Sequence, residues 1–155
     1  MDRFRTNIEI KPSPDPLSYH TPVMMLGSCF TENIGRYLQE YKYPVCLNPF
    51  GVLYNPVSIL KSLEILTGKI QWNENNLVFH QGLWHSFYHH SSFSSPDKQE
   101  CLNAVQLEAK NASAFLRKAN FLFISWGTAR AYIFRKTGEV VSNCHKIPAG
   151  EFDRF

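Results

Sequence analysis

The spacing of hydrophobic positions changes along this chain, and the changes separate expected strands from expected helices. Short apolar runs occur at residues 23–26, 43–47 and 121–125. Such runs are typical of strands that a parallel sheet buries on both faces. Between them, apolar residues recur at the three-to-four-residue spacing of an amphipathic helix. Strand and helix therefore alternate, which predicts an α/β fold with a parallel sheet covered by helices.

Capping residues mark the expected starts of three helices. Thr31 caps the first, Asn55 before Pro56 caps the second, and the segment Ser95-Pro96-Asp97 begins a third that runs to about residue 118. The second helix is expected to end at Gly68. The side chains expected to form the apolar stripes of the helices are Ile34, Tyr37, Leu38 and Tyr41, then Val57, Leu60, Leu63 and Leu66, then Leu102, Val105, Ala109, Ala112 and Leu116.

The remaining segments predict local structure around one domain. Residues 77–90 are rich in aromatic residues and histidine, which indicates irregular structure or a hairpin packed over the domain. Residues 131–143 predict a second hairpin, which turns near Gly138. The proline-rich residues 1–21 predict an extended arm across the body of the domain, so that residues 22–155 form the folded unit.

Composition and charge narrow the classes of protein. The chain has 155 residues, of which 44% are hydrophobic, so it can bury a core. Its net charge of +3 comes from scattered lysines and arginines, which gives no indication of nucleic-acid binding. No apolar run is long enough to span a membrane and the N-terminus lacks the pattern of a signal peptide, so we expect cytoplasmic residence. The four cysteines form no C-x-x-C pair, which argues against a disulfide framework or a metal site.

The most informative local motif is Gly27-Ser28-Cys29, between the first apolar run and the first helix. A strand, a tight turn and a helix can present a nucleophilic side chain beside the free N–H groups of a helix N-terminus. Those groups favour negative charge on a nucleophile or on a substrate oxyanion. The alternative is structural: Ser28 only caps the helix, and Cys29 packs as a small apolar residue.

Several motifs in order resemble the GSCFA-domain family. They are "LGSCFTENIGRYL", "NPFGVLYNP", "WHSFYHHSSFS", "WGTARAYIF" and "NCHKIPAGEF", and together they span nearly all of residues 22–155. That family is similar to the SGNH/GDSL hydrolases, which are esterases and acyl hydrolases. The resemblance implies a three-layer, doubly wound parallel sheet of the flavodoxin-like type. The sequence ends without a closing strand or helix pattern, so we expect it to be the N-terminal portion of such a domain.

The resemblance also implies a nucleophile. In the G-D-S-L-T block of the superfamily the serine attacks, and this register places Cys29 at that position and Ser28 at that of the aspartate. A shift of one residue makes Ser28 the nucleophile, but it spoils the match of Phe30 and Thr31. Both residues remain candidates, with Cys29 preferred.

Two further blocks imply the groups that hold the substrate oxyanion. The loop after the second strand offers Gly51, whose N–H matches a family donor, and Asn48 as a candidate substrate-binding residue. The third block is G-x-N-D in the superfamily, but here it reads Gly127-Thr128-Ala129-Arg130, without the asparagine. Thr128 or Arg130 is the candidate replacement. Loss of one oxyanion donor costs about 3 kcal/mol of transition-state stabilisation.

The sequence does not contain the block that supplies the general base in the superfamily. The D-x-x-H block of the superfamily is absent from this sequence, so we expect that histidine in a further portion of the protein. His145 is a candidate within the chain, because it follows an expected strand in a family motif. His89 or His90 is a candidate for lining the cleft. No cofactor or metal is expected.

These observations predict a hydrolase that acts on an ester or acyl group of a small molecule or glycan. The alternative is a non-catalytic module that binds an acyl or glycan ligand on the same fold, which the missing asparagine favours. We expect neither nucleic acid nor membrane as a partner. The sequence leaves the substrate and the oligomeric state open.

Overall fold

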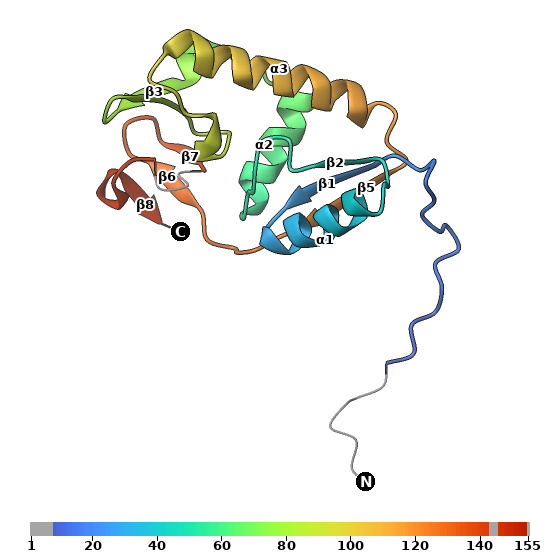
Figure 1. The fold of residues 1–155 in the computed structure, drawn as a ribbon. Helices are drawn as coiled ribbons and strands as arrows, with labels where there is room; N and C mark the ends of the chain where they lie inside the picture. Colours follow the sequence, from blue (N-terminus) through green and yellow to red (C-terminus); the bar gives the residue numbers. More distant parts are fainter. Residues whose placement is uncertain (1–7, 143–145, 155) are drawn as a thin grey trace.

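A parallel sheet of three strands forms the centre of the computed structural model, which describes residues 8–142 and 146–154 (Figure 1). The strands are β1 (Val23–Gly27), β2 (Val45–Leu47) and β5 (Phe121–Ser125), in the order β2-β1-β5. Both neighbours of β1 pair with it in parallel. The alternation of strand and helix therefore predicted the parallel sheet correctly.

Three helices pack around this sheet. Helix α1 (Cys29–Glu40) contacts all three strands, while α2 (Pro56–Leu66) and α3 (Lys98–Leu116) pack against each other over the opposite face (Figure 1). Every residue of β1 is buried, which explains its continuous apolar run. The main core beside β1 consists of Met24, Leu26, Phe50, Leu53, Ile59, Leu66 and Ala112.

Antiparallel elements form the other half of the domain. Strands β3 (Leu77–His80) and β4 (Leu83–Ser86) make the hairpin predicted as one of two alternatives for residues 77–90. A second sheet has the order β7-β6-β8, from β6 (Tyr132–Phe134), β7 (Glu139–Val141) and β8 (Phe152–Arg154). The β6–β7 hairpin and its turn at Gly138 (φ 70°) agree with the prediction. Single-turn 3₁₀ helices occupy Glu74–Asn76, Ser91–Phe93 and Ala149–Glu151.

Two predictions about burial around the sheet are wrong. Strand β5 is not fully buried: it is an edge strand, and Leu122, Phe123 and Ile124 are each about 40% exposed. Helix α1 exposes Ile34 and much of its apolar stripe, because its buried positions are the smaller residues Thr31 and Gly35 on a neighbouring side of the helix, where Gly35 packs under Leu47. Apolar spacing therefore predicted that β5 and α1 exist, but not which of their side chains are buried. The exposed members of the predicted stripe are Ile34, Tyr37 and Tyr41, while Leu38 is half-buried.

Three further predictions need correction. Helix α1 starts at Cys29 with Ser28 as its N-cap, so Thr31 lies inside the helix. Helix α2 is rotated from the predicted stripe, with Leu60 exposed and Ile59 buried. The described part of the arm, residues 8–21, has no helix or strand and, apart from the stacking of Tyr19 on Tyr43, runs away from the domain (Figure 1). The N-cap of α2, Asn55, is as predicted, and α3 begins at the predicted segment 95–97, with Asp97 as its N-cap.

Candidate active site at the β1–α1 turn

The β1–α1 turn, residues 27–31, begins with a glycine that no other residue can replace without strain. Gly27 has φ 142°, and a Cβ atom built on it would lie 2.1 Å from the carbonyl oxygen of Ser125. Its N–H donates to Asn48 Oδ1 at 2.8 Å. The turn is therefore held between the ends of two other segments, β5 on one side and the loop after β2 on the other.

Ser28 is the buried member of the candidate pair. Its side chain is 5% exposed, its N–H donates to Ser125 Oγ at 3.2 Å, and the two hydroxyl oxygens lie 3.0 Å apart. Thr31 Oγ1 also makes a short hydrogen bond with Ser125 Oγ. Ser28, Thr31 and Ser125 thus form a closed hydroxyl cluster, which positions the turn. Ser125 was not a candidate from sequence; its position at the end of β5, next to β1, places it here.

Cys29 is the exposed member of the pair and the first residue of α1. The N-cap Ser28 makes no side-chain hydrogen bond to the N–H groups of the first turn. These groups and the positive end of the helix dipole therefore lie beside an accessible thiol. This is the arrangement that suits negative charge developing during acyl transfer.

Asn48 is a structural link rather than an open binding group. It is buried with φ 41°, its N–H donates to Met25 O at 2.8 Å, and its Nδ2 donates to Glu32 Oε2 at 2.8 Å. Its amide therefore connects β1 to α1. Glu32 was also missed as part of this site, although an acidic residue in the first turn of a helix is a signal for the N-terminus.

The N–H groups predicted to hold an oxyanion are already bonded within the protein. The Gly51 N–H donates to Asn48 O at 2.6 Å, and the N–H groups of Gly127 and Thr128 donate to Tyr54 O at 2.9 and 3.2 Å. In this conformation all three N–H groups are bonded to backbone carbonyls of the protein. Gly51, with φ 78°, instead allows close packing, since an added Cβ would lie 2.2 Å from the Cβ of His90.

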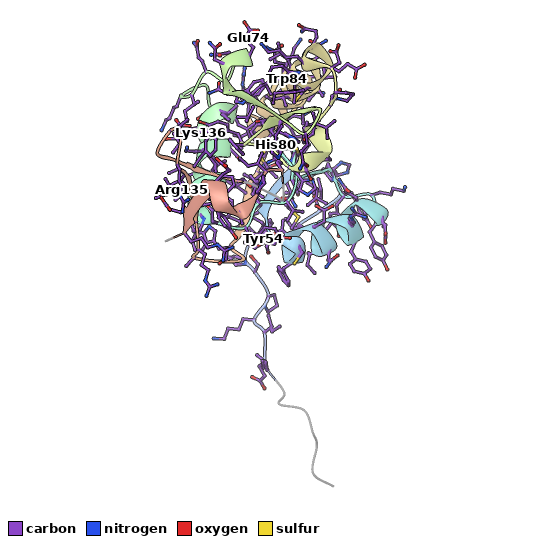
Figure 2. All side chains as sticks on the ribbon, turned by 90° about the vertical axis from the view of Figure 1, so that its left-hand side faces the viewer. Tyr54, Glu74, His80, Trp84, Arg135 and Lys136 are labelled. Atoms are coloured by element: carbon purple, nitrogen blue, oxygen red, sulfur yellow. The ribbon has the colours of Figure 1, made fainter. Side chains whose placement is uncertain are left out.

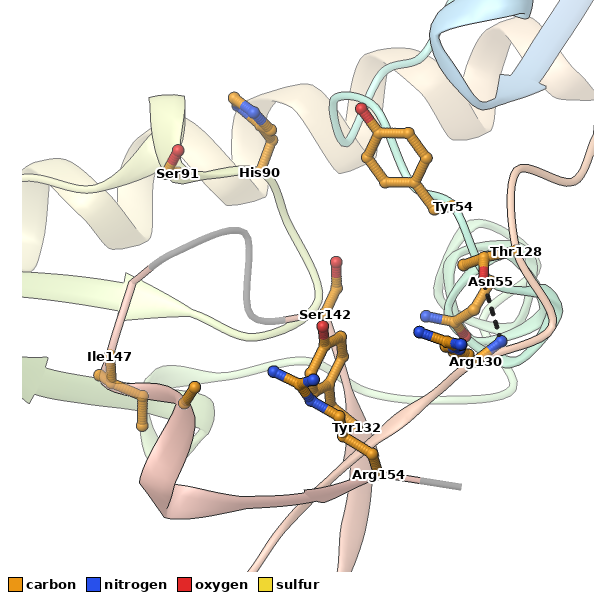
Figure 3. A pocket seen from close by; sticks show the side chains of 11 residues that line it. Tyr54, Asn55, His90, Ser91, Thr128, Arg130, Tyr132, Ser142, Ile147 and Arg154 are labelled. Carbon is orange, nitrogen blue, oxygen red and sulfur yellow. Dashed lines mark hydrogen bonds between the residues drawn. The ribbon is translucent and has the colours of Figure 1, made fainter.

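A cavity of about 520 Å³ is lined by Tyr54 and Thr128, among other residues (Figure 3). Gly127 joins it to the turn, because its N–H donates to Tyr54 O and a Cβ built on it would lie 3.0 Å from the Cβ of Ser28. Tyr54 lies at the end of the domain away from the hairpin residue Trp84 (Figure 2). Neither Ser28 nor Cys29 is among the residues that line it, whereas the predicted residues Thr128 and Arg130 are. The described residues that line it are Tyr54, Asn55, His90, Ser91, Thr128, Arg130, Tyr132, Ser142, Ile147, Ala149 and Arg154.

The structure places His89 in the core, so its predicted role in lining a cleft is wrong. It is 0% exposed, its ring packs against Phe50, Trp72 and Phe93, and its Nδ1 lies 2.7 Å from Ser86 Oγ. Burial, with a smaller contribution from a nearby lysine, lowers the pKa of His89 to about 3.

His90 lines the cavity instead of His89. Burial and the charge of Lys146 lower its pKa, partly offset by Glu32. The Ser92 N–H donates to Nδ1 of His90, so the proton of the neutral ring lies on Nε2. The other candidate, His145, lies outside the described residues.

Together these features define a mixed α/β domain with a strand–turn–helix site at the carboxyl end of a parallel sheet. The chain belongs to the GSCFA family, whose model matches residues 22–155. No curated protein and no solved structure matches the chain significantly. In the described part of the chain, no helix is both long and apolar enough to cross a membrane. The same part contains no group of three or more His, Cys, Asp or Glu side chains arranged to hold a metal ion.

Proposed function

We propose that this chain carries the nucleophile of an SGNH-like acyl hydrolase, and that Cys29 attacks the carbonyl of an ester or thioester. The observation that carries the proposal is the contrast within the turn: Cys29 is exposed at the start of α1, whereas Ser28 is buried and bonded to Ser125. A nucleophile must reach its substrate, so the contrast favours Cys29. The strand order β2-β1-β5 also agrees with the start of a flavodoxin-like, doubly wound sheet.

The chemistry follows from the position of the thiol. The thiolate Sγ adds to the carbonyl carbon, and the oxyanion that forms lies near the N–H groups of the first turn of α1. The tetrahedral intermediate then expels the alcohol or thiol, which takes a proton, and leaves an acyl group on Cys29. Water hydrolyses this thioester in a second step. In the described ranges no histidine hydrogen-bonds to Ser28 or Cys29, so we expect acylation to outpace deacylation.

Because the acyl-enzyme should accumulate, the experiment detects this covalent intermediate rather than product turnover. The protein is incubated with p-nitrophenyl acetate at pH 7.5, and the acetylated peptide is identified by mass spectrometry. We expect one acetyl group on Cys29 and none in Cys29→Ala. Cys46→Ala is the matched control, because burial and then Glu108 raise the pKa of the Cys46 thiol to about 11, so that it stays protonated.

The variant Ser28→Ala separates the two candidate nucleophiles. If Cys29 attacks, Ser28→Ala is still acetylated, although more slowly if the hydroxyl cluster positions the turn. Acetylation at Ser28 instead would transfer the nucleophile to the serine and refute the role of Cys29. Absence of acetyl groups from both residues, with p-nitrophenyl thioesters tested as well, would refute covalent chemistry at the turn.

A non-catalytic module that binds an acyl or glycan ligand is the second candidate. The observation that favours it is the internal bonding of the Gly51, Gly127 and Thr128 N–H groups, which leaves no oxyanion hole at those positions in this conformation. This function predicts saturable binding of octanoate or of an acetylated sugar such as N-acetylglucosamine, measured by NMR titration, without acetylation of the protein.

A further inference from the structure

The cavity beside the turn has an unbalanced charge. Its lining contains two arginines, Arg130 and Arg154, and no aspartate or glutamate. The two come from different elements: Arg130 lies in the loop after β5, and Arg154 lies in β8. Figure 3 shows both side chains at the cavity. Among the described residues neither guanidinium takes part in an ion pair.

The structure explains why Arg154 faces the cavity without a carboxylate. Arg154 stands opposite Tyr132 in the β6–β8 register, and its guanidinium lies 5.5 Å from the centre of that ring. Side chains alternate along a strand, so the preceding Asp153 points to the other face. There it forms an ion pair with Arg135 at 2.9 Å, and Arg135 also donates to Gly150 O at 2.8 Å. The nearby acid is thus bound by another arginine.

Arg130 is held by its backbone rather than by its side chain. Its N–H donates to Thr128 Oγ1 at 3.0 Å, which orders the loop at the cavity wall (Figure 3). The amide of the neighbouring Asn55 is occupied, because it caps α2 by accepting from Ser58 N–H and donates to Ser58 Oγ. The guanidinium of Arg130 therefore stays available to a ligand.

We propose that this cavity binds the oxyanion group of a ligand, a carboxylate or a phosphate, between Arg130 and Arg154. The planar fork of a guanidinium matches either group through paired N–H···O bonds. Cation–π contact with Tyr132 holds Arg154 in place before binding, which lowers the entropic cost. That the anion belongs to the substrate of Cys29 rests on the proposed function; the binding itself does not.

The test measures binding in Cys29→Ala, so that it is independent of acyl chemistry. Inorganic phosphate and acetate are titrated separately into ¹⁵N-labelled protein at constant ionic strength, and backbone and arginine Nε–H signals are followed by NMR. We expect saturable shifts at Thr128, Arg130 and Arg154 for one or both anions. The anion that binds more tightly identifies the source of the ligand group.

Matched variants decide whether the arginines are responsible. Arg130→Gln and Arg154→Gln should each weaken binding about tenfold or more, because each loses hydrogen bonds to a charged group. Arg117→Gln is the control, since it removes the same charge at the C-cap of α3, outside the cavity lining and away from Arg154, and it should leave binding unchanged within about twofold. Their NMR spectra report whether each variant is folded.

Two results would overturn the proposal: shifts that do not saturate for either anion, or equal weakening in Arg117→Gln, which would indicate a general charge effect. Anion binding without acetylation of Cys29 would refute the hydrolase alone. Acetylation of Cys29 in the parent protein, without saturable anion binding in Cys29→Ala, would refute the anion site alone.

Discussion

The β1–α1 turn and the adjacent cavity use polar residues in opposite ways. At the turn, the polar side chains of Ser28, Thr31 and Asn48 are buried and bonded to other protein groups. At the cavity, Arg130 and Arg154 reach an open space without a carboxylate partner. The first arrangement fixes a backbone, because each buried polar group has one favourable position. The arrangement at the cavity leaves the hydrogen bonds of the two guanidinium groups to be made by a ligand.

The two regions differ in the role that we assign to them: the turn presents a reactive group, and the cavity binds a ligand. The turn presents the exposed thiol of Cys29 on a backbone that buried hydrogen bonds hold in place. The cavity offers charge and volume, and neither Ser28 nor Cys29 is among its described lining residues. A ligand anchored in the cavity would place its remaining part toward Tyr54 and Thr128, next to the turn. Variants that loosen the turn should therefore change stability, while variants of the cavity should change binding.

Gly27 should give the largest effect. We expect Gly27→Ala to lower the free energy of unfolding by about 4 kcal/mol or more, because it combines an unfavourable φ with a collision against the β5 backbone. Gly138→Ala is the control: it also has positive φ, but open space surrounds it, so its cost should be about 1 kcal/mol. Urea denaturation of both variants measures the difference. Equal costs would show that the contact with Ser125 is not the constraint.

Asn48 should give an intermediate effect on stability. Asn48→Ala leaves the Gly27 N–H without its acceptor and removes the bond to Glu32, and we expect a loss of about 2–3 kcal/mol. Asn48→Asp keeps the acceptor but places a second carboxylate beside Glu32.

The Asp variant should therefore depend on pH in a defined direction. Repulsion between the carboxylates raises the pKa of the pair in the folded state, so protonation at lower pH restores stability. The loss of unfolding free energy in Asn48→Asp, relative to the parent protein, should be larger at pH 7 than at pH 4.5. Denaturation at both pH values measures it. A difference that is constant with pH would contradict the contact between Asn48 and Glu32.

Substitution of His89 should give the smallest effect on stability. This buried residue lies next to the cavity lining. It precedes the lining residue His90, and its carbonyl accepts from Lys146 Nζ at 2.5 Å. Its pKa of about 3 in the folded state lies below the ordinary 6.5. Below pH 6.5 the unfolded chain therefore binds a proton that the folded chain does not, and stability falls by about 1.4 kcal/mol per pH unit.

The expected loss between pH 6.5 and pH 5 is about 2 kcal/mol from His89 alone. His89→Gln removes the titrating group but keeps polar atoms, so it should flatten this part of the pH profile. His85 and His90, whose pKa values are also lowered by burial, would retain a smaller slope. An unchanged slope in His89→Gln would show that this ring is hydrated in the folded protein.

The outcome of the sequence predictions depended on how local each feature was. The cap Asn55, the helix start at residues 95–97, the hairpin turn at Gly138 and the apolar run of β1 act within a few residues, and the structure agrees with each. The N-cap of α1 was misplaced by three residues, because Thr31 and Ser28 are both good caps and the choice depends on contacts with Ser125. The burial of β5 and His89 was also misjudged, since aromatic residues and histidine occur in cores and at surfaces alike.

The sequence by itself determined the alternation of strands and helices, the position of the β1–α1 turn and membership of the GSCFA family. These depend on periodicity, on turn residues and on motif order, which are properties of neighbouring positions. Only the tertiary structure decided that Cys29 rather than Ser28 is accessible, and that Arg130 and Arg154 line one cavity. Accessibility and the meeting of distant charges depend on which elements pack together, and here residues far apart in the chain, such as Ser28 and Ser125, set that packing.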